Sequence, residues 1–157
     1  MTPTIRALAL ALLGAALAAA PLGAEPTPAA PEPPRPAAPA APTAESEFNR
    51  GLRAQTARDW SAAVAAYRRA TELRPAYAEA WNGLGFALRS QGRPQDALAA
   101  YYEALRLRPE FPEALEYLGA AYVKLGRLDD ARRVLERLRS LDAGRARELA
   151  AEIARAR

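Results

Sequence analysis

From about residue 45 to residue 141, apolar residues recur at the spacing of an α-helix rather than at that of a β-strand. In the most regular stretch they fall at i, i+3, i+4 and i+7, which places them on a single helix face. This stripe consists of Trp81, Leu84, Gly85 and Leu88, and a matching stripe on the following segment consists of Ala97, Tyr101 and Ala104. The pattern predicts an all-α fold with helices near residues 45–57, 60–73, 77–90, 94–107, 111–125 and 128–141.

The helical pattern also repeats at a fixed interval, which is the separation of Leu73 from Leu107. The sequence LRPAYAEAWNGLGFA at 73–87 is nearly restated as LRPEFPEALEYLGAA at 107–121. Shifting the most regular unit forward by this interval gives Leu115, Leu118, Gly119, Tyr122, Ala131, Leu135 and Leu138. Shifting it back by the same interval gives Gly51, Ala54, Ala63, Tyr67, Ala70 and Pro75. Because one such hairpin cannot bury its apolar face alone, we expect the three units to stack on one another.

These residues resemble the tetratricopeptide repeat, whose signature over about 34 residues is Trp, Leu, Gly, Tyr, Ala, Phe, Ala and Pro. The resemblance covers residues 44–143 in three units, 44–77, 78–111 and 112–143, and implies an α-solenoid. The signature positions are Gly51, Ala63, Tyr67, Pro75, Trp81, Leu84, Gly85, Ala97, Tyr101, Ala104, Pro109, Leu118, Gly119, Tyr122 and Ala131. The first unit departs most from this signature, because Glu47 and Arg50 occupy two of its core positions. It also has Arg58 at the inter-helix turn, where the other two units have Gly92 and Gly126.

The small residues of the repeat predict close helix contacts. At Gly85 and Gly119 the missing side chain should let the first helix of a hairpin press against the second, with Ala97 and Ala131 on the opposite wall. Prolines mark the helix ends: Pro75 and Pro109 separate the units, while Pro94 and Pro112 suit the first turn of a helix.

The last segment, 144–157, predicts a capping helix. Ala146, Leu149, Ala150 and Ile153 fall on one side, and charged residues fall on the other. A solenoid needs a terminal element that covers its last apolar face and presents a polar one to water. The alternative is a basic amphipathic helix on a membrane surface, for which the apolar stripe is thin.

The N-terminal residues read as an export signal. Arg6 precedes an apolar run, Ala7–Ala20, and small residues follow it up to Ala24, so residues 1–24 are typical of a cleaved signal peptide. The alternative is an uncleaved anchor formed by residues 7–24. Residues 25–43 contain eight prolines and predict a disordered Pro/Ala-rich linker. The expected location is therefore the periplasm, with anchorage in the inner membrane or secretion as alternatives.

Composition narrows the function. The chain has no cysteine and no histidine, so the commonest general base and the commonest zinc ligands are missing. The acidic pair Asp129 and Asp130 lies at a helix start, where carboxylates stabilise the helix dipole. We therefore expect no enzyme, no cofactor and no metal site. The net charge of +4 is dispersed along the helices, which does not favour nucleic-acid binding.

The remaining candidate surface is the concave face of the solenoid, formed by the first helix of each unit. Residues there that point away from the core stripe form the predicted partner-binding groove: Glu45, Phe48, Leu52, Glu79, Asn82, Phe86, Arg89, Glu113, Glu116 and Lys124. Phe48, Leu52 and Phe86 would anchor apolar groups, and the glutamates would favour a basic ligand. The alternative interpretation is that the phenylalanines only pack against neighbouring hairpins and the glutamates only complement helix dipoles.

In the family that the chain resembles, this groove binds peptides or helices of partner proteins. Members that hold the C-terminal carboxylate of chaperones use a clamp of lysines, asparagines and an arginine, whose places are here occupied by Phe48, Leu52, Gly83, Glu113 and Tyr117. The resemblance therefore implies a protein-interaction adaptor or scaffold in the cell envelope, whose ligand is not a terminal carboxylate. The alternative is a membrane-anchored or self-associating structural component of an envelope assembly.

Overall fold

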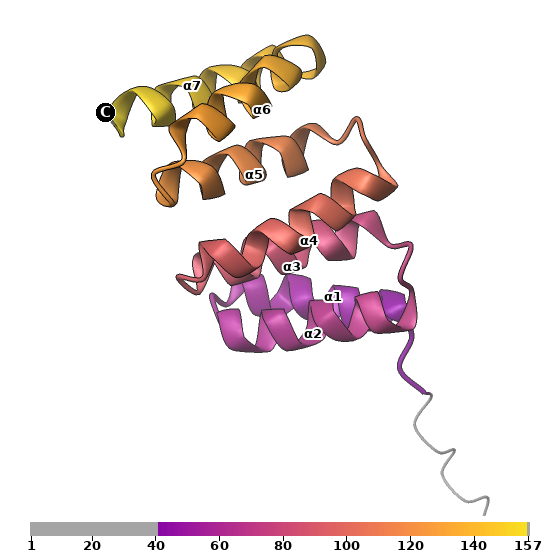
Figure 1. The fold of residues 1–157 in the computed structure, drawn as a ribbon. Coiled ribbons are helices and arrows are strands. Elements are labelled where there is room, and N and C mark those ends of the chain that lie inside the picture. Colours follow the sequence, from indigo (N-terminus) through magenta and orange to yellow (C-terminus); the bar gives the residue numbers. More distant parts are fainter. Residues whose placement is uncertain (1–40, 157) are drawn as a thin grey trace, which may run out of the picture. The chain divides into compact units, whose positions relative to one another are not determined.

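A computed structural model describes residues 41–156 of the chain, and these residues form helices without a strand (Figure 1). The helices are α1 (Ala44–Thr56), α2 (Trp60–Leu73), α3 (Ala78–Ser90), α4 (Pro94–Leu107), α5 (Pro112–Lys124), α6 (Leu128–Leu141) and α7 (Ala143–Arg155). The six helices predicted from periodicity are confirmed, and their bounds differ from the prediction by about one residue at most. The predicted signal peptide and most of the predicted linker lie outside the described residues.

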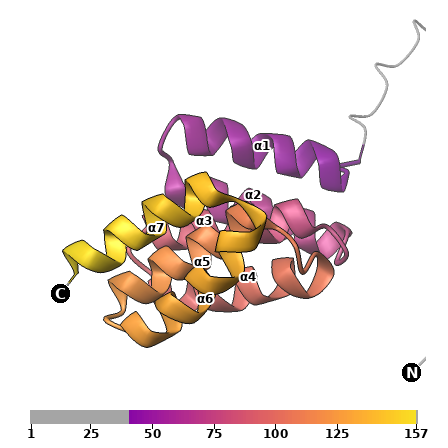
Figure 2. The same ribbon diagram turned by 90° about the horizontal axis from the view of Figure 1, so that it is seen from above.

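The helices form three hairpins, α1–α2, α3–α4 and α5–α6, which stack in chain order (Figure 1). Each helix contacts the next one along the chain, and α1, α3, α5 and α7 also contact one another in sequence. The first helices of the hairpins and α7 therefore follow one another along the stack, which Figure 2 shows from a perpendicular direction. This arrangement confirms the predicted solenoid.

Side-chain caps fix several helix starts. Thr43 and Ser46 form a reciprocal capping box at α1, in which each side-chain oxygen accepts from the other residue's backbone N–H. Asp59 accepts from the Ala62 N–H at 3.0 Å at the start of α2, and Asp142 accepts from two N–H groups at the start of α7. Helices α4 and α5 begin instead with Pro94 and Pro112, as predicted.

The turn inside each hairpin uses a left-handed residue at the same repeat position. Gly92 has φ 83° and Gly126 has φ 70°, whereas Arg58 adopts φ 57° in the first unit. A side chain in this region crowds the following carbonyl oxygen, so arginine is the less favourable residue there. The departure of the first unit from the repeat signature at Arg58 thus has a local conformational cost.

Most of the predicted signature residues lie in the core. Tyr67 and Tyr101 are fully buried, as are the small residues Ala63, Ala97 and Ala131. Trp81 is only partly buried, and its indole Nε1–H donates to the Pro75 carbonyl oxygen at 2.8 Å, which ties α3 to the loop before it.

Two tyrosine rings hold α3 from opposite sides. A Cβ atom built at Gly85 would lie 2.6 Å from the Tyr101 ring of its own hairpin, as predicted for this glycine. A Cβ atom at Gly83 would lie 2.8 Å from the ring of Tyr67, which belongs to the preceding hairpin and also packs against Gly51. The stack of the first two hairpins therefore depends on a backbone-to-ring contact at Gly83.

The prediction for Gly119 is wrong about its partner. A Cβ atom at Gly119 would collide with the side chain of Leu149 on α7, not with a residue of α6. The reason is that α6 carries Leu135 where α4 carries Tyr101, so the space over Gly119 is filled from α7. Helix α7 contacts both α5 and α6 and buries Leu149 and Ile153, which confirms its capping role. Within residues 41–156, no helix is both long and apolar enough to span a bilayer.

Candidate functional site: the groove across α1, α3 and α5

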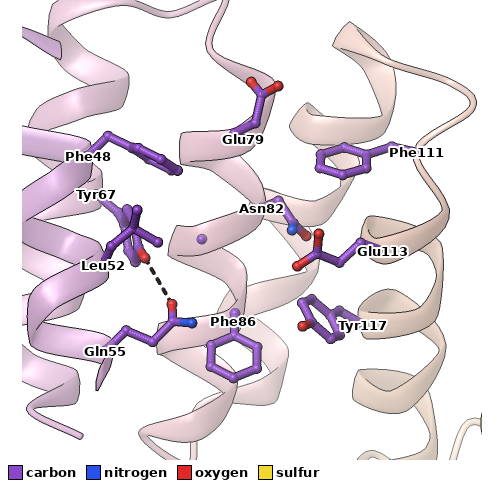
Figure 3. Close-up of a pocket in the computed structure, with 11 residues that line it drawn as sticks. Phe48, Leu52, Gln55, Tyr67, Glu79, Asn82, Phe86, Phe111, Glu113 and Tyr117 are labelled. Atoms are coloured by element: carbon purple, nitrogen blue, oxygen red, sulfur yellow. Dashed lines mark hydrogen bonds between the residues drawn. The ribbon is translucent and has the colours of Figure 1, made fainter. Parts of the chain in front are cut away.

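A cavity of about 200 Å³ opens on the layer formed by α1, α3 and α5, and we call it the groove (Figure 3). Its wall combines aromatic, amide and carboxylate side chains from three hairpins. The lining residues are Phe48, Leu52, Gln55, Tyr67, Glu79, Asn82, Gly83, Phe86, Phe111, Glu113 and Tyr117.

The aromatic side chains of the groove pack against neighbouring hairpins on one side and line the cavity on the other. The Phe48 ring lies 5.6 Å from the ring of Tyr67 and 5.0 Å from that of Tyr77. The Phe86 ring lies 5.0 Å from that of Tyr117, across the boundary between the second and third hairpins. Such contacts hold the rings in place, so the groove presents a rigid apolar surface.

Leu52 adds a more exposed apolar contact at the α1 edge of the groove. The residue is 41% exposed, although it is large and hydrophobic. An exposed leucine next to rigid aromatic rings is a suitable contact for an apolar group of a partner.

Two tyrosines of the groove stay neutral over a wide pH range. Burial, followed by the negative charge of Glu113, raises the pKa of Tyr67 to about 12 and that of Tyr117 to about 12. The Tyr67 hydroxyl donates to Gln55 Oε1 at 2.8 Å, a bond drawn in Figure 3. The charge of Glu113 therefore acts on both tyrosines of the groove.

The acidic residues at the helix starts fall into two groups. Glu45 pairs with Arg74, and Glu79 pairs with Arg108, so the same ion pair recurs from the first unit to the second. Burial raises the pKa of Glu79, but the hydrogen bond and charge of Arg108 outweigh it and hold that pKa below its usual value. The equivalent residue of the third unit is Glu113, which makes no ion pair with the described residues. The reason is that Asp142 occupies the position equivalent to Arg74 and Arg108.

Glu116 faces the capping helix. Its carboxylate pairs with Arg145 of α7, and its side chain is only 15% exposed. Burial raises the pKa of Glu116 despite the opposing charge of Arg145. This contact joins α5 to α7 and keeps Glu116 out of the groove lining.

The structure thus brings six of the ten predicted groove residues together around one cavity: Phe48, Leu52, Glu79, Asn82, Phe86 and Glu113. Glu45, Glu116 and Lys124 do not line it. Arg89 lies at its border, with its guanidinium carbon 5.5 Å from the centre of the Phe86 ring and 5.4 Å from that of Tyr117.

Sequence reasoning missed Phe111 and the second role of Tyr67 as groove residues. Phe111 closes the second unit as Tyr77 closes the first, and both rings lie beneath the arginine of the preceding turn, Arg108 and Arg74 respectively. The repeated Arg-Pro-x-aromatic pattern was the signal that could have identified Phe111. Tyr67 was assigned to the core alone, because the repeat signature does not indicate which edge of a core ring faces a groove.

The acidic pair at the start of α6 forms surface ion pairs. Asp130 contacts Arg127 and Arg133, and Asp129 contacts Arg132. The hydrogen bond from Arg127 lowers the pKa of Asp130. Among residues 41–156, no group of three or more acidic, histidine or cysteine residues is placed to hold a metal ion.

Comparisons with known proteins agree with the geometry. Two sequence profiles described as tetratricopeptide repeat match residues 48–112 and 88–153. The chain belongs to the tetratricopeptide repeat family. A search of curated protein sequences finds no match.

Three solved structures illustrate the similarity. The TPR2B domain of yeast Sti1 in its pHsp70 complex is 23% identical with a TM-score of 0.69, over 73% of this chain and 98% of that one. The first TPR of RPAP3 bound to the HSP90 peptide SRMEEVD is 19% identical with a TM-score of 0.69, over 73% and 92%. MamA is 27% identical with a TM-score of 0.59, over 72% of this chain and 61% of that one. At these identities the similarity to Sti1 and RPAP3 concerns the fold.

Proposed function

We propose that this protein is a non-catalytic adaptor that binds a peptide or helix of a partner protein in the groove. The observation that supports this most is an open cavity lined by rigid aromatic rings, an exposed leucine and a carboxylate outside the structural ion pairs. Apolar anchors with a few placed polar groups are the usual composition of a recognition site. A solved TPR domain that is bound to an HSP90 peptide supports peptide binding as a function of this fold.

The partner we propose differs in charge from that chaperone peptide. The peptide SRMEEVD carries three acidic residues near its C-terminus. Here Phe48, Leu52 and Glu113 occupy places where a carboxylate clamp needs cationic or amide side chains. The groove therefore favours a segment that offers apolar groups and a positive charge.

We propose the cell envelope as the site of this work, with the periplasm as the compartment. Support comes from the sequence of residues 1–24, which has the charge, apolar run and small residues of an export signal. A chain anchored by residues 7–24, or a self-associating assembly component, is the alternative. The mass of the mature chain distinguishes cleavage from anchorage, and its oligomeric state in solution tests self-association.

The adaptor proposal is tested by crosslinked pull-down from the envelope fraction. The intact protein is compared with Phe86→Ala, which shortens a groove wall, and with the matched control Tyr102→Ala on α4, an exposed aromatic residue outside the groove. Thermal unfolding of each variant first establishes that it is folded. We expect Phe86→Ala to lose the partner and Tyr102→Ala to keep it. Retention of the partner by both variants would place binding on another surface.

A further inference from the structure

Asn82 is the one buried side chain of the groove, among the described residues, that has an oxygen without a hydrogen-bond partner. The residue is only 5% exposed, and its Oδ1 atom makes no hydrogen bond to the described residues. A buried carbonyl oxygen that lacks a donor is unfavourable, because folding removes it from water without replacing the lost bond. Asn82 also lines the groove, so a donor brought by a ligand could reach this position.

Glu113 faces Asn82 across the boundary between α3 and α5. Both side chains line the same cavity, and Figure 3 shows the Glu113 carboxylate turned towards the Asn82 amide. The other acidic residue of the lining, Glu79, is engaged by Arg108. Within residues 41–156 no arginine forms an ion pair with Glu113, because Asp142 stands at the position equivalent to Arg108. The Tyr117 hydroxyl and the charge of Arg145 do act on this carboxylate.

Carboxylates outnumber guanidinium groups at this end of the groove, although Arg89 lies at its border, with its guanidinium carbon 5.4 Å from the centre of the Tyr117 ring. A shallower hollow adjoins the groove and shares Glu113 and Phe111 with it. Taken together, the two linings carry four carboxylates, from Glu79, Glu110, Glu113 and Asp142, and two guanidinium groups, from Arg108 and Arg145. Both arginines are engaged, Arg108 with Glu79 and Arg145 with Glu116 and Asp142.

We propose that Asn82 and Glu113 form a receptor for the cationic side chain of a lysine or arginine in the partner segment. This inference rests on the proposed function and names the chemistry of the partner. The carboxylate supplies the charge, and the amide oxygen supplies a second acceptor for the N–H groups of the cation. The Phe111 and Tyr117 rings border the same space and pack against the methylene groups that carry the charge.

A competing role for the pair is purely structural. If the Asn82 amide were rotated so that its NH2 group donated to Glu113, the two residues would satisfy each other and need no ligand. The substitution Asn82→Asp separates the roles. In a cation receptor the bound cation offsets the repulsion between the two carboxylates, so binding is preserved or strengthened. In the structural role the substitution removes the hydrogen bond that positions Glu113, so binding is weakened.

The experiment uses the full chain and a phage library of random octapeptides. Phage recovered on the wild-type protein, but not on Phe86→Ala, are sequenced, and the recovered peptides are synthesised. Fluorescence polarisation then measures the dissociation constant of each peptide and of a copy with norleucine in place of its lysine or arginine. The measurements are made on the wild type, Glu113→Gln, Asn82→Asp and the control Glu72→Gln, which removes an exposed carboxylate on α2, away from the groove and the adjoining hollow.

We expect the recovered peptides to share one lysine or arginine next to an apolar residue. Norleucine in the peptide and Glu113→Gln in the protein should each weaken binding by about tenfold, and together by no more than either alone. Glu72→Gln should change binding by less than about twofold, since a distant exposed charge contributes little. Asn82→Asp should bind at least as tightly as the wild type.

Other results overturn the inference. Peptides that depend on Phe86 but carry no shared cation would refute the receptor and leave the adaptor function standing. Recovery of no Phe86-dependent peptide would refute both. Weaker binding by Asn82→Asp would assign Asn82 to the structural role. A dimer in light scattering that Glu113→Gln dissociates would show that the cation comes from a second copy of this chain, not from a partner.

Discussion

The substitution Gly83→Ala tests how the first two hairpins are joined. Gly83 lies in α3 and faces the ring of Tyr67 from the preceding hairpin. An added methyl group would come within 2.8 Å of that ring. Tyr67 is buried and also packs against Gly51, so its ring can shift only towards the groove, where its hydroxyl is held by Gln55.

Two opposing effects decide the magnitude. Alanine stabilises a helix by about 1 kcal/mol relative to glycine, so the same change at an open site would be favourable. Overpacking a well-filled site costs about 1–3 kcal/mol. The net expectation for Gly83→Ala is a loss of about 1 kcal/mol, and removal of the ring by Tyr67→Leu should turn the same substitution into a gain. The coupling between the two positions should therefore be about 2 kcal/mol.

Urea unfolding of the four proteins of this double-mutant cycle, followed by circular dichroism, measures the coupling. The control is Gly144→Ala in α7, where the added methyl group meets only the Asp142 carboxylate, at 3.2 Å. That substitution should show no coupling to Tyr67. If Gly83→Ala stabilised the protein by about 1 kcal/mol in both backgrounds, the close stacking of α3 on Tyr67 would be incorrect.

Three further predictions concern the turn, the cap and the groove tyrosines. Arg58→Gly should stabilise the fold by about 1 kcal/mol in urea unfolding, because it relieves a left-handed residue, and an unchanged or lower midpoint would contradict this. Leu149→Ala should lower the free energy of unfolding by about 2–5 kcal/mol, since this fully buried side chain covers α5. The pKa of about 12 for Tyr67 and Tyr117 means that folding favours their neutral form, so stability should hold below about pH 10 and fall between about pH 10 and pH 12. Titration of tyrosinate absorbance should show that both pKa values are lower in Glu113→Gln than in the wild type. Unchanged pKa values would show that the charge of Glu113 does not act on these tyrosines.

The fold could be predicted from sequence because its determinants are local and repeated. Periodicity identified each helix, and the fixed interval between matching residues such as Gly85 and Gly119 identified the hairpin as the unit of stacking. Gly85 was also assigned correctly, since its contact with Tyr101 lies within one hairpin and follows the repeat signature. The repeat signature gave the wrong partner for Gly119, because this glycine contacts Leu149 of the capping helix, which belongs to no repeat.

The groove was predicted at the level of a helix face, not at the level of individual charges. Helix geometry placed Glu79, Glu113 and Glu116 on one side, but it could not indicate which arginines would reach them. Arg108 arrives from the end of the second hairpin and Arg145 from the cap, so two of the three carboxylates are neutralised by long-range contacts. Those contacts are tertiary, and a helical wheel does not contain them. The export signal, which lies outside the described residues, stays a prediction.

The most direct test of the account is to locate the bound partner on the protein. Amide chemical shifts of the isotope-labelled chain are recorded during titration with the tightest octapeptide recovered from the library. We expect the largest changes in α1, α3 and α5, around Phe48, Asn82, Phe86 and Glu113. Changes confined to the outer helices α2, α4 and α6, or to α7, would contradict this expectation.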